Sequence, residues 1–262
     1  MNDTCSKNHV PQDSDAFCMH TVNIRKGLNQ DYASREAVNT LCTNLTFLGD
    51  DVRRILITSC REHEGKSFLS LSTLMTLAKM GYKTLLIDTD LRRSVYVRQC
   101  GMRFEGSKEG LGLAHYLSHQ AALEDVVYAV RDQECAYFIP AGHDVANSLS
   151  LLSGARFKTL MDEMSKKVDF IIVDTPPIGA IVDAAAVSAH CDGAILVFSP
   201  NLINQREILE AKEQLERANC RILGGVLNKV VLNKTSSRYY YRSKYAAYGT
   251  KYYYRRDNKK KK

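Results

Sequence analysis

Short apolar runs alternate with helical patterns along most of this chain, and no other feature constrains its fold as strongly. Strands that are apolar throughout are buried on both faces, which is typical of parallel sheets covered by helices. We therefore predict an α/β fold with a doubly wound, mostly parallel sheet and helices on both of its faces. The expected strands are residues 53–59, 83–90, 136–142, 168–176, 192–199 and 221–228. The expected helices are residues 31–48, 66–81 and 204–218.

Composition divides the chain into three segments. Residues 1–30 predict a flexible N-terminal arm, residues 31–230 a folded domain, and residues 231–262 a disordered tail. The N-terminal segment lacks the apolar core of a signal peptide, and no apolar run approaches the ~20 residues of a membrane span. The eight cysteines form no C-x-x-C pairs, which favours reduced thiols over a disulfide framework. We therefore expect a cytoplasmic protein.

The end of the chain differs from the rest in charge and in aromatic content. From Lys229 onward there are twelve Lys and Arg residues and one acid, Asp257, while the net charge of the whole chain is +7. Residues 1–228 therefore carry about −4, and the basic character belongs to the tail. Eight of the fourteen tyrosines lie there, namely Tyr239, Tyr240, Tyr241, Tyr245, Tyr248, Tyr252, Tyr253 and Tyr254.

Residues 65–67, Gly-Lys-Ser, form the end of a phosphate-binding loop where a predicted strand leads into a predicted helix. In such a loop, backbone N–H groups receive phosphate oxygens, the lysine reaches the β- and γ-phosphates, and the serine ligates magnesium. Cys60 stands at the first glycine of the pattern, so a chance Gly-Lys-Ser at a helix start is the alternative. The expected nucleotide-binding residues are Glu64, Gly65, Lys66, Ser67, Phe68 and Asn228. Asn228 would read the adenine edge, unless it only terminates a strand.

Acidic residues follow two more of the predicted strands. Asp88 and Asp90 come at the end of one apolar run, with Arg92 just beyond, and Asp174 ends another. In an open parallel sheet, ligands bind outside the carboxyl ends of the strands, where these side chains meet the phosphate loop. Two such carboxylates are able to hold magnesium and to orient an attacking hydroxyl group. The alternative is a set of solvated acids at strand ends.

The order of these motifs resembles the bacterial tyrosine kinases. Gly-Lys-Ser is followed by hhhDxDhR at residues 85–92, by hhhDxxP at residues 171–176, and by the tyrosine-rich tail. Over roughly residues 31–262, the sequence is most similar to the separate cytoplasmic kinases of capsule and exopolysaccharide systems, the CpsD/CapB type. Further stretches that look like this family are residues 110–118 and 173–197.

This resemblance implies a P-loop NTPase fold and an enzyme that transfers phosphate from ATP, with Mg²⁺, to protein tyrosine. Asp88 and Asp90 would serve the metal and the incoming phenol, and Arg92 would stabilise charge or hold the two acids in place. The residues implied in catalysis are Lys66, Asp88, Asp90, Arg92 and Asp174. The residues implied in metal binding are Ser67, Asp88 and Asp174. The implied phosphoacceptors are the eight tail tyrosines.

The resemblance also implies partners. Such kinases act on one another's tails, which implies a homo-oligomer, with residues 31–48 as the candidate oligomerisation helix. They are switched on by the cytoplasmic end of a membrane-embedded protein that controls polysaccharide chain length, so we expect a location at the inner face of the cell membrane. An anionic membrane surface also fits the basic tail. We expect no nucleic-acid partner, although basic residues with stacking aromatics are an alternative interpretation of the tail.

The chain departs from the family pattern in three places. Glu62 and His63 replace Pro-Gly in the phosphate loop, which adds bulk and negative charge near the phosphates. Asn39 and Cys42 replace both arginines of the Glu-x-x-Arg-x-x-Arg helix motif, which puts a ring assembled through that helix in doubt. The PPNP-x-ELL segment appears as VANSLSLL at residues 145–152.

Two other functions remain open on the sequence. A degenerate nucleotide-binding scaffold of the same polysaccharide machinery would explain the altered loop. A partitioning or positioning ATPase of the ParA/MinD type shares the fold, but that class carries a second lysine where this chain has Arg61. For a kinase, the tail is both substrate and switch, because each added phosphate removes ~1.5–2 units of positive charge.

Overall fold

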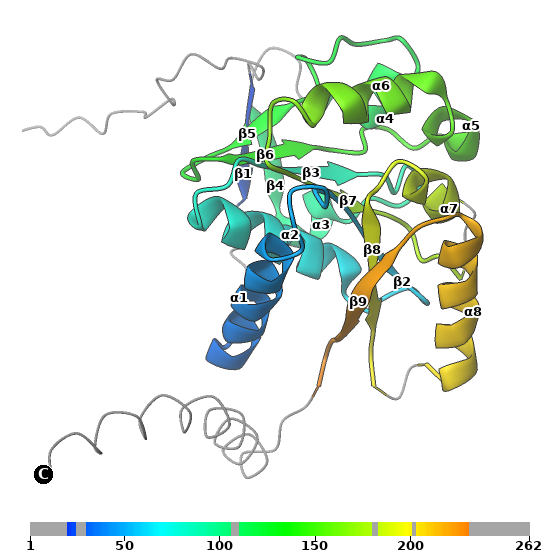
Figure 1. The fold of residues 1–262 in the computed structure, drawn as a ribbon. Helices are drawn as coiled ribbons and strands as arrows, with labels where there is room; N and C mark the ends of the chain where they lie inside the picture. Colours follow the sequence, from blue (N-terminus) through cyan, green and yellow to red (C-terminus); the bar gives the residue numbers. More distant parts are fainter. Residues whose placement is uncertain (1–19, 25–29, 106–109, 180–182, 201–202, 231–262) are drawn as a thin grey trace, which may run out of the picture. The chain divides into compact units, whose positions relative to one another are not determined.

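The computed structural model describes residues 20–24, 30–105, 110–179, 183–200 and 203–230, which form one sheet with helices on its two faces (Figure 1). The strands are β1 (His20–Ile24), β2 (Arg54–Ser59), β3 (Thr84–Asp88), β4 (Met102–Glu105), β5 (Tyr128–Val130), β6 (Ala136–Ile139), β7 (Phe170–Asp174), β8 (Gly193–Phe198) and β9 (Ile222–Leu227). The helices are α1 (Tyr32–Thr46), α2 (Lys66–Lys79), α3 (Tyr96–Cys100), α4 (Leu113–Leu117), α5 (Ser148–Leu152), α6 (Ala155–Met164), α7 (Asp183–Ser188) and α8 (Gln205–Arg217).

The strands lie in the order β4-β1-β5-β6-β3-β7-β2-β8-β9. From β6 to β9 every neighbouring pair is parallel, and the antiparallel pairs β1–β4 and β5–β6 lie at the other end of the sheet. The predicted doubly wound, mostly parallel architecture is confirmed. The phosphate-loop strand β2 lies between β7 and β8, which places the loop beside the ends of its neighbours.

Each face of the sheet has its own hydrophobic core. Along β2, Ile55 and Ile57 pack toward α1, α2 and α3, while Leu56 packs toward α4 to α8. All three side chains are fully buried, which explains why this strand is apolar at successive positions instead of alternating with polar residues. The same alternation between the two cores recurs in β3 and β7, so these central strands form a rigid platform for the residues at their carboxyl ends.

The N-terminal segment contains structure that the sequence analysis did not predict. Strand β1 lies within residues 1–30, where we expected a flexible arm, and that expectation is wrong for residues 20–24. β1 pairs with β4 on one side and β5 on the other, and Val22 is fully buried. Only two of its five residues are aliphatic, so the strand depends on pairing with distant segments and not on a local pattern.

Helix α1 confirms the helix expected within residues 31–48. It begins after Asp31, whose Oδ1 accepts a hydrogen bond of 2.8 Å from the backbone N–H of Ser34, a normal helix cap. Cys42 is fully buried and its Sγ lies 3.9 Å from the carbonyl oxygen of Thr73 in α2. One of the two positions that carry arginine in the family motif therefore packs inside this chain. The predicted tail, residues 231–262, lies outside the described residues, and the oligomeric role of α1 stays a prediction.

Candidate functional site

The phosphate loop connects β2 to α2 and ends at Gly65. Gly65 has a φ of +91°, a conformation that glycine adopts without steric cost, and α2 begins at the next residue, Lys66. The first N–H groups of a helix have no partner within it, so the loop presents donors of the kind that phosphate requires. The predicted placement of Gly-Lys-Ser between a strand and a helix is confirmed.

Glu64 holds the loop from inside the protein. Its side chain is fully buried, and its carboxylate accepts hydrogen bonds from the backbone N–H groups of Arg61 at 2.8 Å and Ser199 at 3.1 Å. The carbonyl oxygen of Glu64 accepts a hydrogen bond of 2.8 Å from Nδ2 of Asn228. Glu64 and Asn228, both expected to bind nucleotide, thus lock the loop backbone to the ends of β8 and β9.

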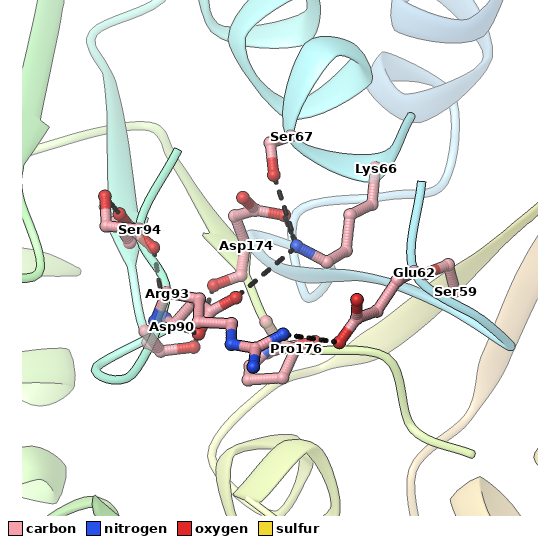
Figure 2. Close-up of polar contacts among 12 residues, drawn as sticks. Ser59, Glu62, Lys66, Ser67, Asp90, Arg93, Ser94, Asp174 and Pro176 are labelled. Atoms are coloured by element: carbon pink, nitrogen blue, oxygen red, sulfur yellow. Dashed lines mark hydrogen bonds and ion pairs between the residues drawn. The ribbon is translucent and has the colours of Figure 1, made fainter. Parts of the chain in front are cut away.

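Three carboxylates meet the loop at the carboxyl edge of the sheet. Asp88 and Asp174 are register partners on the neighbouring strands β3 and β7, and both are 1% exposed. Nζ of Lys66 lies 3.9 Å from Oδ2 of Asp90 and 3.9 Å from Oδ1 of Asp174, and it donates to Oγ of Ser67 at 3.2 Å (Figure 2). The structure therefore brings together five of the residues that the sequence assigned to the site.

The charge state of this cluster follows from its burial. Burial, together with the nearby Asp174 carboxylate, raises the pKa of Asp88 to about 8. Burial also raises the pKa of Asp174, against the opposing effect of the Lys66 ammonium group. One lysine does not neutralise three acids, so the protein without a bound cation keeps a proton on Asp88 at neutral pH. A divalent cation bound here would favour loss of that proton.

Two hydroxyl groups that the sequence analysis missed contact these acids. Oγ of Ser94 donates to Oδ2 of Asp88 at 2.5 Å, and the phenol of Tyr96 donates to Oδ2 of Asp174 at 2.9 Å. Ser94 follows the turn at residues 91–93 that comes after β3, and Tyr96 is the first residue of α3. Neither belongs to a motif, and the only signal in the sequence was their position shortly after the Asp-x-Asp pattern.

A cavity of about 510 Å³ opens beside Lys66 and Asp90. Arg93 crosses this region to Glu62 of the phosphate loop, with Nη1 and Oε1 3.6 Å apart (Figure 2). His63 has a φ of +64°, in the left-handed region that glycine favours, at a position where the family pattern has glycine. The cavity is lined by Glu62, His63, Lys66, Asp90, Arg92, Arg93, Val95, Arg98, Gln99 and Pro177.

One of the two roles expected for Arg92 was to hold Asp88 and Asp90 in place, but its side chain bonds to other residues. Its Nε donates to Oγ of Ser148 at 2.9 Å and lies 3.6 Å from Oδ2 of the buried Asp183. Ser148 in turn donates to the same Asp183 oxygen at 2.5 Å. Within the described residues, the recorded bonds of Arg92 run to α5 and α7, although its side chain lines the cavity.

The residues expected to bind magnesium supply only part of a coordination shell. Within the described segments, no group of three or more His, Cys, Asp and Glu side chains is arranged to hold a metal ion alone. Ser67, Asp88 and Asp174 offer hard oxygen ligands, which suit Mg²⁺. Magnesium usually takes one or two carboxylates and completes its shell with water and substrate phosphates, so this donor set fits a nucleotide-bound ion.

Comparison with known proteins identifies the family. Residues 53–218 match the AAA domain family. Over 234 residues the chain is 37% identical to tyrosine-protein kinase CpsD of Streptococcus agalactiae. This alignment covers 89% of this chain and 96% of the relative. The chain belongs to the bacterial tyrosine kinases.

Solved structures support the same assignment. The kinase domain of the Escherichia coli tyrosine kinase ETK matches with a TM-score of 0.69 at 29% identity, over 77% of each chain. The septum site-determining protein MinD of Pyrococcus horikoshii, complexed with Mg-ADP, matches with a TM-score of 0.58 at 25% identity, over 70% of this chain and 72% of that one. The P-loop NTPase fold is therefore shared more widely than the kinase family.

The remaining predicted residues of this bacterial tyrosine kinase lie at the edge of the site or outside it. Phe68 is 40% exposed on α2, and no described contact places it against the phosphate loop. The eight tail tyrosines lie outside the described residues. In the part of the chain that the structure describes, no helix is long and apolar enough to cross a bilayer.

Proposed function

We propose that this protein is an ATP- and Mg²⁺-dependent tyrosine kinase that phosphorylates the C-terminal tyrosine cluster of a neighbouring copy. The observation that carries this proposal is the placement of Lys66 between Asp90 and Asp174, beside the phosphate loop and a cavity that solvent reaches. Membership of the bacterial tyrosine kinases supports tyrosine as the phosphate acceptor, and the C-terminal cluster provides eight tyrosines.

The residues of the site divide the chemistry among them. The loop N–H groups and Lys66 bind the β- and γ-phosphates, and Lys66 thereby leaves the two carboxylates that it contacts in the free protein. Ser67, Asp88 and Asp174 would hold the magnesium ion, which when bound would supply neutralisation of charge on the phosphates. Asp90 lines the cavity and accepts the phenol proton as the new O–P bond forms and the bond to the ADP leaving group breaks.

The wider role follows from the family. We infer that the kinase regulates capsular or exopolysaccharide polymerisation and export, with the cytoplasmic end of a membrane-embedded co-polymerase as its activator. Multiple phosphorylation converts the cationic tail into a neutral or anionic one, which changes its attraction to the acidic body and to anionic lipid. This gives the tail the properties of a switch.

The structure disfavours the alternative of a ParA/MinD-type ATPase. That class uses a second lysine at the position of Arg61. Here the Arg61 side chain forms two hydrogen bonds, of 2.6 and 2.7 Å, to Glu207 of its own chain. The position of the second lysine is thus taken by an arginine that pairs within its own chain.

The direct test is intact-mass spectrometry of the protein after incubation with ATP and Mg²⁺, with and without a peptide from the co-polymerase cytoplasmic end. We expect a ladder of phosphate additions on residues 239–254 that is lost in Lys66→Met. Lys79→Met, at the other end of α2, is the matched control and should keep the ladder. If the mass stayed unmodified in all conditions while the protein still bound nucleotide, the kinase proposal would fail in favour of the nucleotide-binding scaffold.

A further inference from the structure

The segment that follows β3 supplies a hydroxyl group to each of two neighbouring strands. Ser94 bonds to Asp88 at the end of β3, and Tyr96, two residues later, bonds to Asp174 at the end of β7. The two acids are register partners in the sheet. In both cases the hydroxyl contacts Oδ2 of the carboxylate, so one short stretch of chain restrains two side chains of the proposed metal site.

Tyr96 is deeply embedded for a residue so close to a catalytic cavity. It is 1% exposed, and its ring packs edge-on against Phe138 with ring centroids 5.2 Å apart. Its hydroxyl lies 2.9 Å from Asp174 and 3.3 Å from the carbonyl oxygen of Ser67. The packed ring fixes where the hydroxyl is, so the Tyr96 phenol is a rigid donor and not a mobile surface group.

This donor contacts the side of Asp174 that is turned away from Lys66. Oδ1 of Asp174 lies 3.9 Å from Lys66 and 3.3 Å from the Ser70 hydroxyl, which it shares with the carbonyl oxygen of Lys66 at 2.9 Å, while Oδ2 receives the phenol. A carboxylate bonded through both oxygens has little freedom to rotate. Loss of a partner that orients a metal ligand typically costs about 10- to 100-fold in metal affinity or activity, because the partner fixes the direction of the ligand's lone pairs.

We propose that Tyr96 and Ser94 are positioning residues that hold Asp174 and Asp88 in the orientation needed to bind nucleotide-associated magnesium. The proposal rests on the proposed function only in taking these two acids as the metal ligands. Tyr96 is the stronger of the two, because it also links the start of α3 to the end of β7 and to the phosphate-loop helix through Ser67.

The test compares Tyr96→Phe with Tyr128→Phe in the full-length protein. Tyr128 is a second fully buried tyrosine whose hydroxyl donates to a backbone carbonyl, that of Leu111, at 3.0 Å, far in the sequence from the site residues. Both substitutions remove one buried hydroxyl and keep the ring, so their thermal stabilities should fall by similar amounts. The readouts are the dissociation constant for ADP with and without Mg²⁺, the Mg²⁺ concentration for half-maximal phosphotransfer, and kcat and KM for ATP.

For Tyr96→Phe we expect the gain in ADP affinity on adding Mg²⁺ to fall about 10-fold, in the range found for partners of metal ligands. Affinity for ADP without Mg²⁺ should stay within about 2-fold of wild type, kcat should fall, and Ser94→Ala should show the same pattern more weakly. Tyr128→Phe should leave the Mg²⁺ effect intact. An unchanged Mg²⁺ effect in Tyr96→Phe would overturn the proposal and leave Tyr96 as a core residue.

The ADP measurement separates this inference from the proposed function. If the wild-type protein transferred no phosphate to tyrosine but Tyr96→Phe still lost the Mg²⁺ effect, the kinase proposal would fail and the positioning role would stand. If the wild-type protein transferred phosphate to tyrosine, and Tyr96→Phe changed neither this transfer nor the effect of Mg²⁺ on ADP affinity, the kinase proposal would stand. The positioning role of Tyr96 would then fail.

Discussion

Arg61 of the phosphate loop and Glu207 of α8 form a two-bond ion pair, with Nε–Oε2 and Nη2–Oε1 distances of 2.6 and 2.7 Å. Glu207 is also part of the start of α8, where its backbone N–H donates to Oδ1 of Asn204. The loop is thus fixed to the N-terminus of a helix that lies 146 residues away in the sequence. Loop geometry and α8 position are therefore coupled.

Removing this ion pair should affect nucleotide binding more than stability. We expect Arg61→Gln to weaken nucleotide affinity by about 3- to 10-fold, equivalent to about 0.7–1.4 kcal/mol. The free energy of unfolding should change by less than about 1 kcal/mol, because the Arg61 side chain is 57% exposed and solvent screens it. Calorimetric titration with ADP and urea unfolding measure both. Arg217→Gln, which breaks an exposed pair with Glu213 in α8, should change neither.

Two glutamates of the loop, Glu62 and Glu64, should respond very differently to truncation. Glu64→Ala leaves the buried N–H group of Ser199 and the half-buried N–H group of Arg61 without their acceptor, so we expect a loss of about 2–4 kcal/mol. Glu62→Ala removes only an exposed partner of Arg93, so stability should stay within about 0.5 kcal/mol. Chemical denaturation of both variants decides the matter. Equal losses would contradict the buried role of Glu64.

His63 occupies a backbone conformation that suits glycine. We expect His63→Gly to raise the free energy of unfolding by about 0.5–1 kcal/mol, because relief of the left-handed conformation exceeds the added entropy of the unfolded chain. His119, with a φ of +60°, lies outside the loop, and its replacement by glycine should give a smaller gain because its Nδ1 lies 3.1 Å from Nη1 of Arg156. Thermal unfolding of both variants, with ADP titration, tests this. A stability loss at residue 63 alone would mean that the His63 side chain contributes more than its conformation costs.

The raised pKa of Asp88 predicts that the free energy of unfolding falls as the pH rises. The folded protein holds this proton up to about pH 8, whereas the unfolded chain loses it near its ordinary pKa of 3.8. The contribution of Asp88 to stability is therefore complete below about pH 4 and declines as the pH rises toward 8. Asp88→Asn cannot ionise, so it should be more stable than wild type at pH 8, by on the order of 1–3 kcal/mol, with a smaller gap at pH 5. Urea unfolding of both proteins without Mg²⁺ between pH 5 and pH 8 would measure this difference. A stability difference that stayed constant with pH would argue against titration of Asp88.

The sequence predicted the central part of the fold well, because its strands are buried on both faces. The strands ending at Asp88 and Asp174 are buried at every position and, apart from Thr84, apolar at every position before the acid, which is typical of parallel strands covered on both faces. The acids at the strand ends then follow from the geometry of a parallel sheet, so their convergence on Lys66 was also predictable. β1 could not be predicted from the sequence, because its short and half-polar segment becomes a strand only by pairing with neighbouring strands.

The supporting residues of the site could not be found in the same way. Tyr96, Ser148 and Asp183 come from three different helices, and each acts through contacts with residues that are distant in the sequence. Such contacts leave no periodicity in the sequence. The loop-holding role of the Glu64 side chain was also missed, since a buried carboxylate that accepts backbone N–H groups looks in sequence like any acid in a loop.

The position of β2 in the sheet has a consequence for synthesis of the protein. β2 pairs only with β7 and β8 within the described residues, and those strands are translated more than a hundred residues later. At 5–20 residues per second, the strand that carries the phosphate loop waits on the order of ten seconds for its first partner. During that time both of its edges are open, and an apolar strand with open edges is prone to pair with other chains. The nucleotide site is thus among the last parts of this protein to form.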